Sequence, residues 1–226
     1  MAFGGFGKGT LDFLAGLSAN NNKAWFDAHR QDYEAHFVGP AVAFVAALAE
    51  PLAKLAPRLN AEPRINGSIF RINRDIRFSK DKTPYKDHLD LWFWEGERKT
   101  ALSGLFFRLT ATEMILGTGC HGFDPARLAA FRQAVCDPKR GPAAAKAVAA
   151  IERAGFTLGG AHYKTLPRGF AASTPAAERL LKHNAFYAVQ TAPHPPGLAT
   201  PGLVDWCVER WRGTLPIHRW LVENLS

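Results

Sequence analysis

Residues His88–Thr118, with the sequence HLDLWFWEGERKTALSGLFFRLTATEMILGT, decide the fold of this chain. Three apolar runs in this stretch are typical of strands: His88–Glu95, Leu102–Thr110 and Thr112–Thr118. Turns at Gly96-Glu97 and near Ala111 separate the runs. Consecutive strands joined by short links pair in antiparallel fashion, so the stretch predicts a β-meander. A further strand is expected just before it, over residues 64–72, where Ile65, Gly67 and Ile69 alternate with polar or aromatic side chains.

Helical patterns flank the predicted sheet on both sides. Before it we expect a short helix capped by Thr10, an aromatic-faced helix over residues 25–37, and a third helix that opens at Gly39-Pro40 and runs to about Ala56. After it we expect helices starting at Asp124-Pro125 and Thr174-Pro175, an alanine-rich helix over 142–154, a short strand over 185–191, and a last helical stretch over 203–221 interrupted at Gly213 and Pro216. The pattern predicts an α+β protein: N-terminal helices, a central antiparallel sheet, and C-terminal helices packed on it.

Length and composition indicate an ordinary globular protein. A chain of 226 residues with 47% hydrophobic residues is expected to form a single domain over residues 1–226. Cys120, Cys136 and Cys207 show no metal-binding spacing, which favours reduced thiols in a cytoplasm. The start MAFGGFGKGT lacks the apolar segment of a signal peptide, and no run approaches 18 apolar residues. We therefore expect a cytoplasmic protein without a membrane span. The sequence indicates neither a cofactor nor an oligomeric state.

The segment Ser68–His88, SIFRINRDIRFSKDKTPYKDH, carries the strongest functional signal. The chain has a net charge of +8, which favours anionic partners although a solvated basic surface would look the same. Arginine offers a planar fork that suits phosphate or carboxylate, and lysine adds a point charge. The segment predicts a site for a phosphorylated or otherwise anionic small molecule, with Asp75 orienting the bases. Its candidate residues are Arg71, Arg74, Asp75, Arg77, Ser79, Lys80, Lys82, Tyr85 and Lys86.

Two other interpretations of this segment stay open. In the first, Asp75, Asp81 and Asp87 pair with the bases and clamp a long loop, although exposed ion pairs contribute only about 0–1 kcal/mol each. In the second, the bases contact the phosphates of a nucleic acid while interleaved aromatic residues stack on its bases. Those aromatic residues are Phe70, Phe78, Tyr85, Trp92 and Trp94.

Weaker patterns suggest other chemistry. The run Ser79-Lys80-Asp81-Lys82 matches the S-x-x-K pattern of penicillin-recognising enzymes, but the companion signatures are absent. A metal or acid/base site could draw on His88, His121 and Asp124, with Asp75 or Asp90 added. No spacing demands such a site, and Asp124 is more simply a helix cap. The sequence therefore leaves open whether the protein is an enzyme.

Three motifs resemble a known family. They are the run 21–26, NNKAWF, the run 71–86 with RINRD and RFSKDKTPYK, and the run 167–170, PRGF. Together they are similar to the bacterial and fungal family catalogued as domain of unknown function 2461, over about residues 6–221. The resemblance implies a single domain of that family's type. It implies no activity and no catalytic residue.

Overall fold

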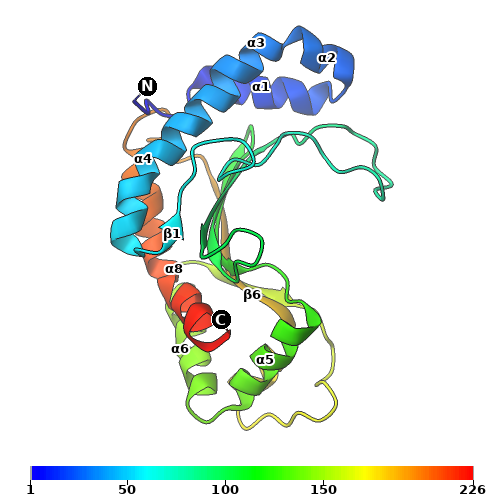
Figure 1. Ribbon diagram of the computed structural model, residues 1–226, viewed down its shortest axis with the longest axis vertical. Coiled ribbons are helices and arrows are strands. Elements are labelled where there is room, and N and C mark those ends of the chain that lie inside the picture. The colour runs from blue at the N-terminus through cyan, green and yellow to red at the C-terminus, as the bar shows by residue number, and fades with distance from the viewer. Residues whose placement is uncertain (1, 226) are drawn as a thin grey trace. The chain divides into compact units, whose positions relative to one another are not determined.

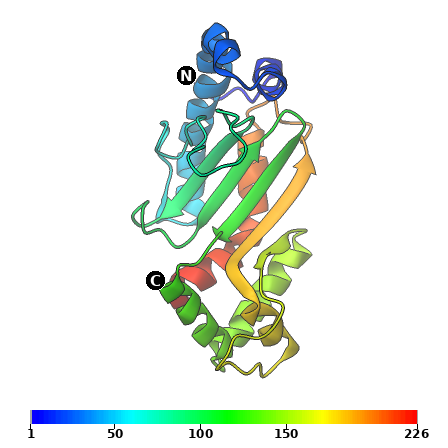
Figure 2. The same cartoon turned by 90° about the vertical axis from the view of Figure 1, so that its right-hand side faces the viewer.

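The computed structural model describes residues 2–225 as an α+β protein with helices at both ends and an antiparallel sheet in the middle (Figure 1). The six strands pair in the order β1-β2-β3-β4-β6-β5. Their bounds are β1 Leu59–Asn60, β2 Leu89–Glu95, β3 Gly104–Leu109, β4 Glu113–Cys120, β5 Thr157–Ala161 and β6 His183–Pro193. The predicted fold class is confirmed. Figure 2 shows β2, β3 and β4 as the expected meander, with β6 beside β4.

Strand β5 was not predicted, because its sequence TLGGA is short and has no alternating pattern. It pairs with β6 from Thr157↔Val189 to Ala161↔His183, with a register shift between Gly159 and Ala161. Gly160 at this shift has a φ of +99°, and a Cβ built there would lie 2.3 Å from the carbonyl oxygen of Ala185. Only glycine fits such a position without strain.

The strand expected over residues 64–72 is wrong. The chain forms a turn there: Asn66 has a φ of 62°, and the amide of Gly67 donates to the carbonyl of Arg64 at 3.0 Å. The dipeptide Asn-Gly strongly favours a turn. This local preference outweighs the weak alternation of apolar and polar residues that suggested a strand. Ile69 is nevertheless fully buried and forms an isolated bridge with Leu91.

The chain divides into two compact units. Unit 1 comprises residues 1–93, 106–116 and 191–209, and unit 2 comprises residues 94–105, 117–190 and 210–226. Strands β2, β3, β4 and β6 and the last helix contribute residues to both units. The expectation of a single domain remains a prediction.

Five helical segments belong to unit 1: α1 Lys8–Ala19, α2 Lys23–Ala28, α3 Arg30–Asp32, the π-helical segment η1 Tyr33–Val38, and α4 Gly39–Leu55. Thr10 was predicted to cap α1, but it lies inside that helix. Its hydroxyl donates to the carbonyl of His36 at 2.7 Å. The expected helix over 25–37 breaks at His29, the residue between α2 and α3. Gly39-Pro40 does not end a helix either, because a continuous helix runs from Arg30 to Leu55. The π-helical segment ends with the amide of Gly39 bonded to the carbonyl of Glu34. Pro40, the next residue, has no backbone N–H, so no donor is left without a partner there.

The helix Arg30–Leu55 is long and apolar enough to cross a membrane by length and composition, and it is the one such helix within residues 2–225. A core helix of a soluble protein passes the same test. The buried side chains on its α4 part are those of Ala41, Phe44, Val45, Leu48, Leu52 and Leu55. Their spacing of three and four residues is that of a helix packed against a core on one face.

Unit 2 contains α5 Pro125–Cys136, α6 Arg140–Arg153 and α7 Pro175–Leu181, and it receives most of α8 Leu203–Leu225. The predicted caps Asp124 and Thr174 accept hydrogen bonds from the amides of Arg127 and Ala177. The expected interruption of α8 at Gly213 and Pro216 is wrong. A proline inside a helix costs about 3 kcal/mol, and burial of the neighbouring apolar side chains outweighs that cost. Those side chains are Leu215, Ile217, Trp220 and Leu221.

Candidate functional site

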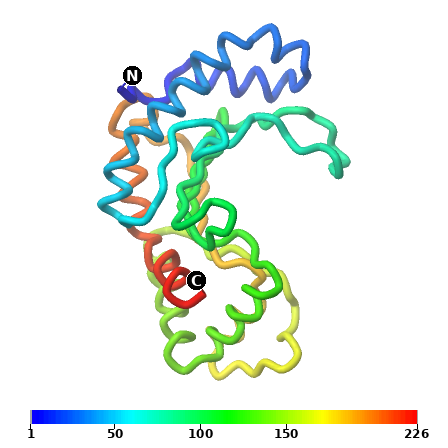
Figure 3. The backbone as a smooth tube through the Cα atoms, viewed as in Figure 1, coloured from blue at the N-terminus to red at the C-terminus, as the bar shows by residue number. Residues whose placement is uncertain are grey.

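Residues 71–86, called the basic loop below, leave the body of unit 1 and return as two adjacent arms (Figure 3). An isolated bridge joins Asn73 to Tyr85, and the amide of Arg74 donates to the carbonyl of Pro84 at 2.9 Å. Tyr85 is buried and its ring stacks on that of Phe26 with centroids 4.3 Å apart. The base of the loop is therefore anchored, while residues 75–83 form its tip.

Asn21 holds the second arm in place. Its side-chain oxygen accepts from the amide of Tyr85 at 3.0 Å, and its side-chain nitrogen donates to the carbonyl of Tyr85 at 2.9 Å. The side-chain amide of Asn21 thus bonds Tyr85 as a neighbouring strand would. It satisfies both the backbone N–H and the backbone carbonyl of Tyr85. This pair of bonds connects the turn after α1 with the basic loop.

A cleft of about 660 Å³ lies among the basic loop, the end of α1 and strands β2 and β3, all within unit 1. Its lining residues are Ser18, Asn21, Arg74, Asp75, Asp81, Thr83, Tyr85, Lys86, Asp87, His88, Asp90 and Arg108. Four of the nine predicted site residues belong to this lining: Arg74, Asp75, Tyr85 and Lys86.

Asp90 on β2 is the most buried carboxylate of the cleft, 6% exposed. Arg108 on β3 holds it with two hydrogen bonds, from Nε to Oδ1 at 2.6 Å and from an Nη atom to Oδ2 at 3.0 Å. Burial alone would raise the pKa of Asp90, but its interactions with His88 and Arg108 hold that pKa below the ordinary value. Asp90 is therefore ionised at neutral pH.

Lys86 reaches the same carboxylate from the basic loop. Its Nζ lies 3.7 Å from Oδ2 of Asp90 and 4.8 Å from the ring centroid of Phe70. Burial lowers the pKa of Lys86, and repulsion from Arg108 and Arg71 adds to that effect, so the attraction of Asp90 does not compensate. The charged form of Lys86 is thus disfavoured mainly by burial and, to a smaller extent, by the two arginines.

His88 lies between two carboxylates. Its Nδ1 is 3.0 Å from Oδ1 of Asp87, and its buried Nε2 is 3.3 Å from Oδ2 of Asp90 without hydrogen-bond alignment. Ser18, in α1, donates to Oδ2 of Asp87 at 3.1 Å. Burial alone would raise the pKa of Asp87, but the hydrogen bonds from His88 and Ser18 lower it. Asp87 is therefore also ionised at neutral pH.

The tip of the basic loop is held by its own ion pairs. An Nη atom of Arg74 lies 2.5 Å from Oδ2 of Asp81 and also bonds the Thr83 hydroxyl. Asp75 receives both guanidinium bonds of Arg77, at 2.9 and 2.6 Å. The backbone and side chain of Thr83, together with Arg74, lower the pKa of Asp81 to about 2. Two of the carboxylate–base pairs expected for a clamp are thus present.

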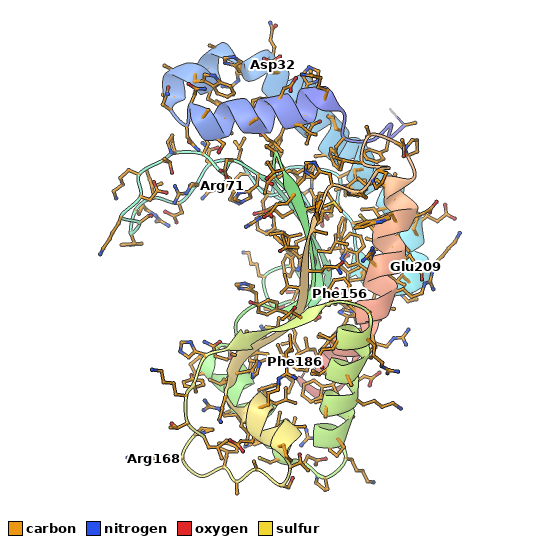
Figure 4. The ribbon with its side chains drawn as sticks, turned by 180° about the vertical axis from the view of Figure 1, so that it is seen from behind. Asp32, Arg71, Phe156, Arg168, Phe186 and Glu209 are labelled. Atoms are coloured by element: carbon orange, nitrogen blue, oxygen red, sulfur yellow. The ribbon has the colours of Figure 1, made fainter. Side chains whose placement is uncertain are left out.

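Five predicted site residues lie outside the cleft lining: Arg71, Arg77, Ser79, Lys80 and Lys82. Figure 4 shows Arg71 on the first arm of the basic loop, before the tip. Within residues 2–225 no carboxylate lies within ion-pair distance of Arg71, although its charge acts on both Lys86 and Asp75. Lys82 donates to the carbonyl of Ile76 at 2.9 Å at the tip.

The weaker sequence patterns find little support. Ser79 lies at the loop tip outside any helix, unlike the serine of an S-x-x-K enzyme. Asp124 caps α5, and the ring of His121 stacks on Tyr187 at 4.7 Å. In the described chain, residues 2–225, no three His, Cys, Asp or Glu side chains are placed to hold a metal ion.

Several lining residues come from other segments of the chain and were not predicted as site residues. Arg108, Ser18 and Asn21 are distant from the basic loop in sequence. One signal was available: Asp90 and Arg108 are charged residues inside strands that otherwise read as apolar, and those strands were predicted to be neighbours. Charges in adjacent strands often pair across them.

Comparison with known proteins gives one match. Residues 9–220 match the family model described as "Conserved hypothetical protein (DUF2461)". No curated protein and no solved structure matches the chain.

Proposed function

The chain belongs to the DUF2461 family, whose description names no activity, and from the geometry of the cleft we propose that it binds a small anion, such as a phosphate or carboxylate group, beside Lys86. The candidate ligand-binding groups in the lining are those of Lys86 and Arg108, with Arg74 on the basic loop, while the charge of Arg71 acts on Lys86 from outside the lining.

The surplus of positive charge around Asp90 carries the proposal. Lys86 and Arg108 both lie within ion-pair distance of the single Asp90 carboxylate, and the charge of Arg71 also acts on Lys86. Burial, with added repulsion from Arg108 and Arg71, lowers the pKa of Lys86, so the ammonium group is disfavoured in the free protein. An anion next to Nζ would offset that repulsion, and Arg108 and Lys86 supply the fork and the point charge suited to it.

Lysine-to-methionine variants test this proposal with a matched pair. Lys86→Met removes the charge in the cleft, whereas Lys82→Met removes an exposed charge from the same loop outside the lining. The probe is inorganic phosphate, followed by isothermal titration calorimetry and by thermal shift. We expect Lys86→Met to weaken phosphate binding by about tenfold to a hundredfold, because charge-assisted hydrogen bonds contribute about 1.5–3 kcal/mol. Lys82→Met should bind as the unmodified protein does, and equal binding by both variants would refute the proposed site.

The exposed tip of the basic loop favours a second candidate, binding of single-stranded nucleic acid. Phe78 is 95% exposed, with the guanidinium of Arg77 5.8 Å from its ring centroid. Lys80 and Lys82 beside it are exposed as well. A base can stack on such a ring while the neighbouring cations contact phosphates.

Fluorescence anisotropy with a labelled oligothymidine tests the second candidate. Its affinity should fall linearly with the logarithm of salt concentration, as counterions are released. Phe78→Ser should weaken binding by about tenfold, since stacking contributes about 1–3 kcal/mol per base, whereas Lys86→Met should leave it unchanged. Affinity that does not respond to salt would contradict this candidate. No binding of phosphate or oligonucleotide would favour the structural clamp.

A further inference from the structure

The charges that line the cleft are not evenly compensated. The lining contains three fixed cations, Arg74, Lys86 and Arg108, and four carboxylates, Asp75, Asp81, Asp87 and Asp90. Arg74 is bonded to Asp81, and Asp75 is bonded to Arg77 outside the lining, so these groups compensate one another locally. The uncompensated charges are positive around Lys86 and negative at Asp87.

Asp87 is the carboxylate of the lining with acceptor capacity to spare. A carboxylate has about four lone-pair sites. Asp87 accepts one hydrogen bond from Ser18 and one contact from His88, and its side chain is half exposed. Asp90, in contrast, is surrounded by Arg108, Lys86 and His88, and Asp81 by Arg74 and Thr83. In the described chain, no lysine or arginine lies within ion-pair distance of Asp87.

The ring of His88 lies between Asp87 and the Lys86–Asp90 pair. It contacts Asp87 through Nδ1 and Asp90 through Nε2, and Asp90 in turn lies against Lys86. The uncompensated carboxylate and the lysine are therefore neighbours in one lining, so one small molecule can contact both.

We infer that the ligand is a small molecule that carries an anionic group for Lys86 and a hydrogen-bond donor, hydroxyl or ammonium, for Asp87. This inference rests on the proposed anion site. A phosphate ester with a hydroxyl or amino group has this chemistry. A polyanion does not, because the Asp87 carboxylate, which no lysine or arginine within residues 2–225 compensates, would repel its additional charges.

Three phosphate monoesters of similar size separate these requirements in calorimetry: ethyl phosphate has no additional donor, glycerol 3-phosphate has hydroxyls, and phosphoethanolamine has an ammonium group. We expect the unmodified protein to bind at least one donor-bearing ester about tenfold more tightly than ethyl phosphate, since a hydrogen bond to a charged group contributes about 1.5–3 kcal/mol. Whether the hydroxyl or the ammonium ester binds more tightly identifies the donor.

The isosteric change Asp87→Asn should remove about tenfold of the preference for the donor-bearing ester over ethyl phosphate. Ser18→Ala removes a neighbour of Asp87 but keeps the carboxylate, so the preference should persist. Equal affinity of the unmodified protein for all three esters, or tighter binding of polyphosphate, would overturn the inference while the anion site stands. If neither the esters nor inorganic phosphate bind, the proposed function itself fails.

Discussion

The guanidinium of Arg108 and the carboxylate of Asp90 form a two-point pair across neighbouring strands, with hydrogen bonds of 2.6 and 3.0 Å. The two residues are 18 positions apart in sequence. Asp90 is almost fully buried, whereas the Arg108 side chain is 32% exposed. The pair thus links two strands of the sheet where they line the cleft, and Arg108 remains accessible from the cleft.

Breaking this pair from one side should destabilise unit 1. Arg108→Gln leaves the buried Asp90 carboxylate without its fork and should lower the free energy of unfolding by about 3 kcal/mol. Urea titration followed by tryptophan fluorescence measures the change. The double change Asp90→Asn with Arg108→Gln should restore part of the loss, because the almost fully buried carboxylate is then no longer left without its arginine. A double variant no more stable than Arg108→Gln would contradict this account.

Stability should depend on pH through His218. In unit 2 its Nδ1 lies 2.9 Å from the Ser103 hydroxyl and its Nε2 lies 3.0 Å from the Glu95 carboxylate. Burial lowers the pKa of His218 below 6.5 despite the nearby carboxylate. Below about pH 6.5 the unfolded chain therefore binds more protons at His218 than the folded chain does. The stability that comes from the neutral His218 is complete above about pH 6.5, and it is lost as the pH falls from there through the lower pKa of the folded state.

Denaturant titrations at pH 7.5 and at pH 5 test this dependence. His218→Gln should reduce the loss of stability between these pH values, while His121→Gln, at an exposed position, should not. His183, whose pKa burial also lowers, should account for part of the remaining slope. An unchanged slope in His218→Gln would show that His218 does not carry the effect.

The basic loop should loosen when Asn21 is removed. Asn21→Ala leaves the amide and carbonyl of Tyr85 without these partners, at a cost of about 1–3 kcal/mol. Hydrogen exchange followed by mass spectrometry should then show faster exchange over residues 71–86. Asn20→Ala is the control, because that side chain bonds only the Gly16 carbonyl of its own helix. The same exchange rate in both variants would argue against the role of Asn21.

Gly119 should not tolerate a side chain. It has a φ of +128°, and a Cβ there would lie 2.4 Å from the carbonyl oxygen of Phe186 on the neighbouring strand. Gly119→Ala should lower the melting temperature by several degrees, because the backbone must shift and a costly φ must be kept. Gly122→Ala, where no atom lies within 4 Å of the added Cβ, should melt as the unmodified protein does. Equal melting temperatures would refute the clash.

Local sequence signals predicted the elements whose cause is local. The alternating runs gave strands β2, β3 and β4, and the cap-plus-proline pairs at Asp124 and Thr174 gave the starts of α5 and α7. The same reasoning failed at Pro216, because the burial of the apolar α8 side chains around it within unit 2 outweighs the local cost of a proline. It also failed for the helix Arg30–Leu55, whose π-turn before Pro40 leaves no signal in the pattern.

The α+β class and the concentration of bases at residues 71–86 follow from the amino-acid sequence, because periodicity and charge can be read along the chain. Which of these bases share a cleft depends on the folded structure. The pairing of β2 with β3 places Asp90 beside Arg108, and Lys86 lines the same cleft. Arg77, in contrast, lies outside the lining. The convergence of side chains depends on strand pairing and on long-range hydrogen bonds, such as that of Asn21 to Tyr85, 64 positions apart. The spacing of residues within one segment encodes neither the strand pairing nor these bonds.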